Sequence, residues 1–137
     1  MSIASSRRFL ALPPNFVDMS IGYQTLLALA KSTKHQGELP NASAHGFATN
    51  ASCGDECDVW VRIEDDTILD VSFVAKGCVI SRAAAAILAE RVRDRIEVIG
   101  TMNGDDMRGL LGADISLLRE RCLTTALKAL QNAVSSL

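Results

Sequence analysis

Hydrophobic and polar residues alternate along 57–64 and again along 68–76, with the period of two that is typical of a β-strand. The tripeptide D-D-T at 65–67 separates the two runs. The apolar positions of the alternation are Cys57, Val59, Val61, Ile63, Leu69, Val71, Phe73 and Ala75. The pattern therefore predicts an antiparallel hairpin with one buried face, which Gly77 ends.

Helical spacing replaces this alternation on both sides of the hairpin. The segment that follows Ser20 places apolar side chains near one helical face, and residues 79–93 are rich in strong helix formers. The apolar set of the first segment is Ile21, Tyr23, Leu26, Leu27 and Ala30. The sequence after 99 is rich in turn residues and predicts at most a short helix at 104–111.

The segment from Ser116 to Val134 has the strongest helical pattern. Its apolar residues recur at steps of three and four, and they are Leu118, Cys122, Leu123, Ala126, Leu127, Leu130 and Val134. This spacing predicts an amphipathic helix that packs on the sheet. With an edge strand around 46–50, the elements predict the α+β class, with an antiparallel sheet of about three strands packed against helices.

The composition of the chain excludes several classes of protein. The chain has 137 residues, of which 48% are hydrophobic and 22% charged, with a net charge of −2. We expect a flexible arm over 1–18 and a single domain over 19–137. No Lys/Arg cluster offers the footprint of a nucleic-acid binder, and no apolar run approaches the roughly 20 residues that span a bilayer. Because the first residues hold only the short apolar run F-L-A-L, we expect no secretory signal and a cytoplasmic location.

The candidate chemistry of the chain lies in its four cysteines, Cys53, Cys57, Cys78 and Cys122. In a chain without a signal peptide they favour metal or thiol chemistry over disulfides. Cys53 precedes the hairpin and Cys78 follows it, so antiparallel pairing brings both to the same end of the sheet. Asp55 lies two residues from Cys53, and Cys122 near the start of the last helix is a third arm of the same candidate site.

Three thiolates and one carboxylate around one point would suit Zn²⁺, and thiolates also suit copper(I) and iron–sulfur centres. A carboxylate is a more exchangeable partner than a fourth thiolate, which favours a working site over a structural one. A helix that begins at Cys78 would favour the thiolate form of that residue. Cys57 follows the phase of the buried strand face, and we expect it to be a thiol of the hydrophobic core.

Three short motifs resemble those of the U-type iron–sulfur cluster assembly proteins, which include IscU, SufU and the N-terminal domain of NifU. They are C-G-D at 53–55, G-C-V-I-S-R-A-A-A-A at 77–86 and R-E-R-C-L-T-T-A-L-K-A-L at 119–130. The second and third are most similar to the SufU branch. The resemblance covers about residues 20–134 and implies the SufE/NifU-like α+β fold, in agreement with the predicted hairpin and final helix.

By position, the resemblance implies that Cys53, Asp55, Cys78 and Cys122 are the ligands of Zn²⁺ or of a transient [2Fe–2S] cluster. It also implies that Cys122, as in IscU-like proteins, or Cys53, as in SufU-like proteins, accepts persulfide sulfur. The chain would then be a scaffold or a zinc-dependent sulfur relay rather than an enzyme, unless the transfer itself counts as a sulfurtransferase activity.

The same resemblance implies two classes of partner, a cysteine desulfurase and the proteins that accept the cluster. Arg121 stands where IscU proteins carry a histidine. I-S-L-L-R at 115–119 replaces the family's L-P-P-V-K chaperone motif, which argues against recognition by an Hsp70-type chaperone.

Two other functions fit the cysteines. A structural zinc module for protein binding predicts tight Zn²⁺, loss of the fold on chelation and no persulfidation. A thiol oxidoreductase that uses Cys53 and Cys57 requires Cys57 to be exposed. His35 and His45 lie in polar sequence, and we expect them to be surface residues rather than ligands. For Trp60, on the outer strand face, we expect a packing role.

Overall fold

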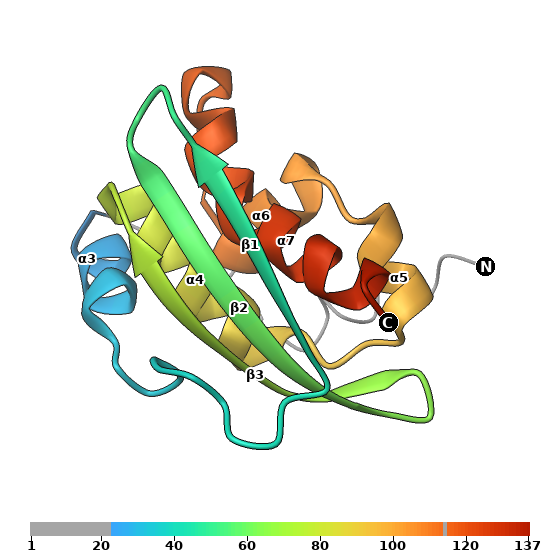
Figure 1. The fold of residues 1–137 in the computed structure, drawn as a ribbon. Coiled ribbons are helices and arrows are strands. Elements are labelled where there is room, and N and C mark those ends of the chain that lie inside the picture. The colour runs from blue at the N-terminus through green and yellow to red at the C-terminus, as the bar shows by residue number, and fades with distance from the viewer. Residues whose placement is uncertain (1–22, 114) are drawn as a thin grey trace.

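The computed structural model describes residues 23–113 and 115–137 (Figure 1). The expected arm over 1–18 lies outside these residues, and the domain boundary at residue 19 stays a prediction. The elements are α3 (Tyr23–Lys31), β1 (Ala44–Asn50), β2 (Asp55–Glu64), β3 (Thr67–Lys76), α4 (Val79–Arg91), α5 (Ile96–Thr101), α6 (Gly104–Leu111), the 3₁₀ helix η1 (Leu117–Arg119) and α7 (Glu120–Ser135).

The sheet has the order β1-β2-β3, with both pairs antiparallel, and the helices cover one of its faces (Figure 1). Helix α7 lies across β1 and β2, and α4 lies against β3 and α7. This arrangement confirms the predicted α+β class and the three-stranded sheet. Among the described residues, none of the helices combines the length and apolar character needed to cross a bilayer.

The β2–β3 hairpin confirms the prediction for 57–76, with one local correction. Its turn places Asp65 and Asp66 at positive φ, a conformation that aspartate tolerates better than most residues. A bulge beside Arg62 then shifts the register, so that Ile68 pairs with Ile63. Ile68 is therefore buried, whereas Leu69 is 41% exposed. The prediction that Leu69 faces the core was wrong, because one extra residue in a strand reverses the side-chain phase.

The predicted short helix at 104–111 and the helix that follows Cys78 are both present. Helix α5 was not predicted, because six residues that include a glycine show no clear period. Helix α7 begins at Glu120, and η1 precedes it. Leu118 lies on η1 and is 94% exposed, so its assignment to the buried face of the last helix was wrong.

Strand β1 and the C-terminal half of α7 approach each other closely at Gly46. A Cβ atom added at Gly46 would lie 2.0 Å from the carbonyl oxygen of Ala129, so only glycine fits there. The buried alanines of α4 similarly leave room for neighbouring helices; they are Ala83, Ala84, Ala85, Ala86 and Ala89. Strand β1 thus packs directly on α7, and this packing fixes the position of the C-terminal end of β1 relative to the first turn of α7.

Candidate metal centre

Three of the predicted ligands meet at one end of the sheet. One ligand atom from each of Cys53, Asp55 and Cys122 lies within 4.8 Å of the other two. The sulfur atoms of Cys53 and Cys122 are 3.5 Å apart, although the two residues are 69 positions apart along the chain. Cys53 is exposed to solvent, whereas Asp55 and Cys122 are buried. The structure therefore forms a group with one accessible thiol in front of two buried donors.

Each member of this group is placed by a different piece of backbone. Cys53 lies in the turn between β1 and β2, where its amide donates to the carbonyl of Asn50 at 3.2 Å and Gly54 has φ +72°. Asp55 is the first residue of β2, and Cys122 lies in the first turn of α7. Because β1 is packed on α7, the turn that holds Cys53 lies beside the helix that holds Cys122.

Both carboxylate oxygens of Asp55 accept a hydrogen bond. The Oδ1 atom accepts from the backbone amide of Cys78 at 3.0 Å, and the Oδ2 atom accepts from Nδ2 of Asn50 at 3.1 Å. A buried carboxylate needs such partners, because its desolvation would otherwise be costly. Each bond takes one of the two lone pairs on its oxygen and withdraws charge from the carboxylate, which makes Asp55 a weaker ligand than a free carboxylate.

Asn50 is the site residue that sequence reasoning missed. It is buried, its Nδ2 atom also lies 3.8 Å from the sulfur of Cys122, and its Oδ1 atom accepts from the hydroxyl of Ser52 at 2.7 Å. One amide side chain thus connects the carboxylate, one thiol and the turn. The available signal was its strand phase, since a polar residue falls in step with the inward-facing Gly46 and Ala48.

Gly77 permits the close approach of the backbone to Asp55. Its φ is +135°, and a Cβ atom at this position would lie 2.1 Å from Oδ1 of Asp55. Any side chain here would both strain the backbone and displace the carboxylate. The glycine that precedes Cys78 is therefore part of how the Cys78 amide reaches Asp55.

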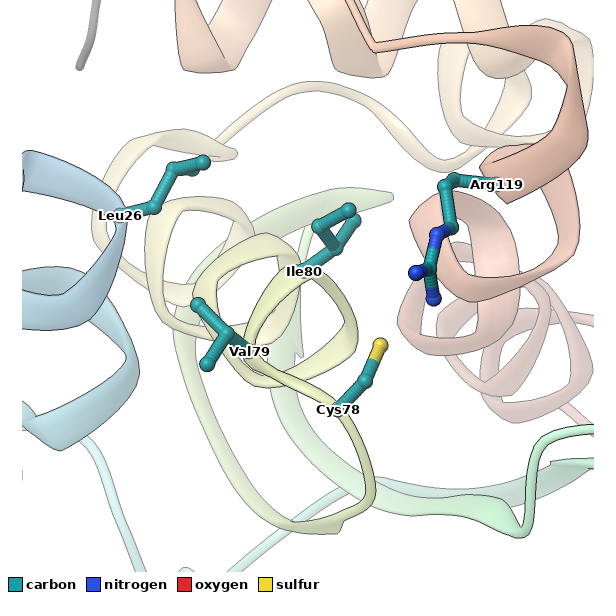
Figure 2. A pocket seen from close by; sticks show the side chains of 5 residues that line it. All are labelled: Leu26, Cys78, Val79, Ile80 and Arg119. Carbon is teal, nitrogen blue, oxygen red and sulfur yellow. The ribbon is translucent and has the colours of Figure 1, made fainter. Parts of the chain in front are cut away.

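Cys78 lies beside the three-residue group. Its sulfur accepts a hydrogen bond from the amide of Ser81 at 3.4 Å and so caps the N-terminus of α4. It also lines a pocket of about 260 Å³ with Leu26, Val79, Ile80 and Arg119. Figure 2 shows the Cys78 sulfur and the Arg119 guanidinium directed toward one another across this pocket. Of the four predicted ligands, three converge closely and the fourth flanks them.

Burial raises the pKa of the Cys122 thiol above its ordinary value, and its interactions with Asp55, Cys53 and Cys78 raise it further. The thiol is therefore protonated near neutral pH when no cation is bound. A thiophilic cation would have to displace that proton, as metal binding to cysteine generally requires.

Cys57 lies outside the group, as its strand phase predicted. It is 1% exposed within the core, and burial, with a smaller effect from Asp58, raises its pKa to about 12. An oxidoreductase that pairs Cys53 with Cys57 needs an exposed second thiol, so the structure contradicts that alternative. All four cysteines are free thiols.

Neither histidine joins the group of ligands among the described residues. The Nε2 atom of His35 lies 2.9 Å from Glu90, and that of His45 lies 2.7 Å from Asp58. The His45 ring stacks on Trp60, with ring centroids 4.9 Å apart. Both histidines thus pair with surface carboxylates, and Trp60 packs against one of them.

Comparison with known proteins gives consistent results. The family described as the NifU-like N terminal domain matches residues 23–137. The chain is 38% identical to the iron–sulfur cluster assembly scaffold protein IscU of Thermotoga maritima over 77 residues. This alignment covers 56% of this chain and 54% of that protein. It is 26% identical to the zinc-dependent sulfurtransferase SufU of Bacillus subtilis over 130 residues, in an alignment that covers 82% of this chain and 88% of that protein.

A solved structure extends the comparison to the fold. It is that of a protein from Fervidobacterium islandicum AW-1, provisionally described as an iron–sulfur cluster assembly scaffold for the SUF system. The two superpose with a TM-score of 0.65 at 25% identity, over 80% of this chain and 93% of the other. The comparison confirms the predicted fold.

Proposed function

The chain belongs to the family of NifU-like N-terminal domains, whose relatives include iron–sulfur cluster assembly scaffolds, and from that premise we propose that it accepts sulfur from a cysteine desulfurase for cluster assembly. One observation carries the proposal. The exposed thiol of Cys53 lies 3.5 Å from the buried thiol of Cys122, with Asp55 completing the group. A sulfur acceptor needs an accessible thiol, and a cluster scaffold needs further donors directly behind it.

The chemistry of the donor set fits Zn²⁺ as a resident ion and a [2Fe–2S] cluster as cargo. Sulfur donors outnumber the carboxylate, a balance that disfavours Mg²⁺ and Ca²⁺. Cys53, Asp55 and Cys122 would hold the metal, with Cys78 beside them as the fourth ligand. Bound Zn²⁺ would keep these thiols deprotonated and protected from oxidation.

Asp55 has a distinct role in this proposal. Because Asn50 and the Cys78 amide already bind its two oxygens, its bond to a metal would be the weakest of the four. One coordination position would then exchange readily, which suits a site that must receive sulfur or release a cluster. Asn50 orients the carboxylate without contributing a ligand of its own.

The sulfur transfer itself is a thiolate–persulfide exchange. The Cys53 thiolate attacks the outer sulfur of a persulfide on the desulfurase, a new S–S bond forms on Cys53, and the donor cysteine leaves as a thiolate. The step balances without an external oxidant or reductant. Its geometric requirement is an exposed attacking sulfur, and Cys53 is the exposed member of the group.

Persulfidation of the purified chain tests the proposal. After incubation with a cysteine desulfurase and cysteine, mass spectrometry should find an added sulfur on Cys53 or Cys122. The variants Cys53→Ser and Cys122→Ser should reduce transfer, whereas Cys57→Ala, which removes a thiol outside the group, should leave it within about twofold of wild type. If both serine variants accept sulfur as wild type does, the relay proposal is wrong.

A structural zinc module is the second candidate, and the distribution of the core argues against it. The buried hydrophobic cluster spans the sheet and helices of the described chain and excludes Cys53, Asp55 and Cys78. Chelation should therefore leave the far-ultraviolet circular dichroism spectrum unchanged, whereas a structural site predicts unfolding. Asp55→Ala separates the roles further, because a scaffold that lacks its labile ligand should retain a reconstituted cluster longer, while a structural site should only lose metal affinity.

A further inference from the structure

Two adjacent leucines are almost fully exposed at the site end of the molecule. Leu117 is 80% exposed and Leu118 is 94% exposed, more than any other large hydrophobic residue in the described ranges. Together they form the outer surface of η1, and we refer to this pair as the leucine ridge. Single exposed leucines are common, whereas contiguous exposed apolar surface with a polar rim is typical of an interaction site.

The surrounding structure holds the leucine ridge in place. Ile115 is buried just before it, and the Nε atom of Arg108 donates to the Ile115 carbonyl at 2.8 Å. The Arg108 guanidinium also pairs with the Glu120 carboxylate, at the first residue of α7. One arginine on α6 therefore clamps both ends of the segment. The leucines project from a fixed turn, so their exposure is a property of the fold.

The leucine ridge adjoins the sulfur-accepting group. Leu118 is four residues before Cys122, a rise of about 8 Å in the 3₁₀ geometry of η1 or about 6 Å in the α-helical geometry of α7. In Figure 1, the segment that contains η1 and the turn between β1 and β2 lie side by side at one end of the molecule, in agreement with the contact between Cys53 and Cys122. A protein interface of ordinary size covers about 800 Å² on each partner, which is a disc of roughly 16 Å radius. An interface of that size centred on Cys53 would include the ridge.

The charges around the leucine ridge indicate the chemistry of the partner. Arg119 and Arg121 are exposed on either side of Glu120, and the nearby carboxylates of Glu120 and Asp105 are both paired with Arg108. The surface that remains is therefore apolar with a cationic border. Its complement is an apolar notch bordered by Asp and Glu side chains.

We propose that the leucine ridge is the docking surface for the protein that donates sulfur to Cys53, which would bind it through an apolar notch with an acidic rim. The inference rests on the proposed function, since it assigns a surface to the partner of that same site. Docking at the ridge would place the donor's persulfide over the exposed thiol, while Arg119 and Arg121 orient the acidic rim. Two exposed, rigidly held leucines are suited to be the main binding contacts of such an interface.

The test compares Leu117→Ser and Leu118→Ser, singly and together, with the control Leu137→Ser. Leu137 is also an exposed leucine, at 59%, but it lies beyond the far end of α7. The donor is a cysteine desulfurase that persulfidates the wild-type chain, and its Kd is measured by calorimetry. The double variant should bind it at least tenfold more weakly and accept sulfur from it at least tenfold more slowly. Persulfidation by inorganic polysulfide and the bound zinc content should change by less than twofold, and Leu137→Ser should match wild type.

The outcomes separate the docking surface from the function. If the double variant keeps its affinity for the desulfurase within twofold, the leucine ridge is not the docking surface, although the sulfur-accepting function stands. If no desulfurase persulfidates the wild-type chain, the function itself is overturned and the docking inference with it. If the wild-type chain is a dimer that the double variant converts to monomers without loss of desulfurase affinity, the ridge joins two copies of this chain and the proposal is wrong.

Discussion

Replacing Gly77 with alanine tests the arrangement around Asp55 most directly, because the change introduces one methyl group at the point of closest approach. Gly77 has φ +135°, where an alanine costs about 1–3 kcal/mol in backbone strain. The new Cβ atom would lie 2.1 Å from Oδ1 of Asp55, so the carboxylate must move and release the Cys78 amide. A lost hydrogen bond to a charged group costs about 1.5–3 kcal/mol. The two effects together should lower the free energy of unfolding by roughly 2.5–6 kcal/mol.

Two other glycines separate these effects. Gly54 has φ +72° but no atom within 4 Å of an added Cβ, so Gly54→Ala should show strain alone, about 1–2 kcal/mol. Gly100 lies in α5 with neither positive φ nor a neighbour within 4 Å. Gly100→Ala should therefore stabilise the protein by about 0.5–1 kcal/mol.

Urea denaturation of the reduced, chelator-treated proteins measures all three changes. The free energy of unfolding and its dependence on urea are compared with wild type, and zinc affinity is then determined by competition with a chromophoric chelator. Gly77→Ala should lose zinc affinity as well as stability, whereas Gly100→Ala should keep the wild-type affinity. If Gly77→Ala is no less stable than Gly54→Ala and binds zinc as tightly as wild type, Asp55 is not held as described.

Three further predictions concern groups near and far from the metal centre. With a pKa of about 12, the Cys57 thiol should be ionised in only about one molecule in 10⁴ at pH 8. Peptide mass spectrometry should therefore find Cys57 unlabelled by iodoacetamide in the folded protein and labelled in urea. Rapid labelling of the folded protein would contradict its burial. Asn50→Ala should lower the free energy of unfolding by about 1–3 kcal/mol in urea titrations, because Asp55 keeps its burial but loses a donor; an unchanged midpoint would show that the amide is dispensable. The hydrogen bond to His35, with a contribution from Lys34, lowers the pKa of Glu90 in the folded protein. The ionised Glu90 carboxylate therefore stabilises the fold above the unfolded pKa of about 4.3, and this stabilisation is lost as pH falls through the folded pKa. Glu90→Gln should therefore lose less stability than wild type between about pH 5 and 3, by under about 1 kcal/mol because the carboxylate is largely exposed; parallel pH profiles of the two proteins would contradict the pairing.

Local patterns were sufficient where one periodicity decides the structure. The alternation on either side of Asp65 predicted the hairpin, and the spacing after Ser116 predicted the last helix. The pattern failed at Leu69 and Leu118 for a shared reason. At Leu69 the bulge buries Ile68 in its place, and at Leu118 the 3₁₀ turn leaves both Leu117 and Leu118 exposed, and an apolar run specifies neither outcome.

The candidate site was predictable to the extent that topology determines it. The antiparallel hairpin brings the positions before and after it to one end of the sheet, which is why Cys53 and the Cys78 backbone both approach Asp55. Side-chain details depend on contacts between distant segments. Asn50 therefore escaped notice, and the capping role of the Cys78 sulfur was not foreseen.

The separation of 69 positions between Cys53 and Cys122 also has a consequence for the order of events in biogenesis. The β2–β3 hairpin has mostly local contacts and is expected to form early, whereas Cys122 arrives only when α7 docks against β1. Before that moment each thiol stands alone, open to oxidants and to stray copper, without the neighbours that would shield it. A nascent molecule is therefore more vulnerable than a finished one, and a reducing environment matters most during the brief interval before its last long-range contact closes.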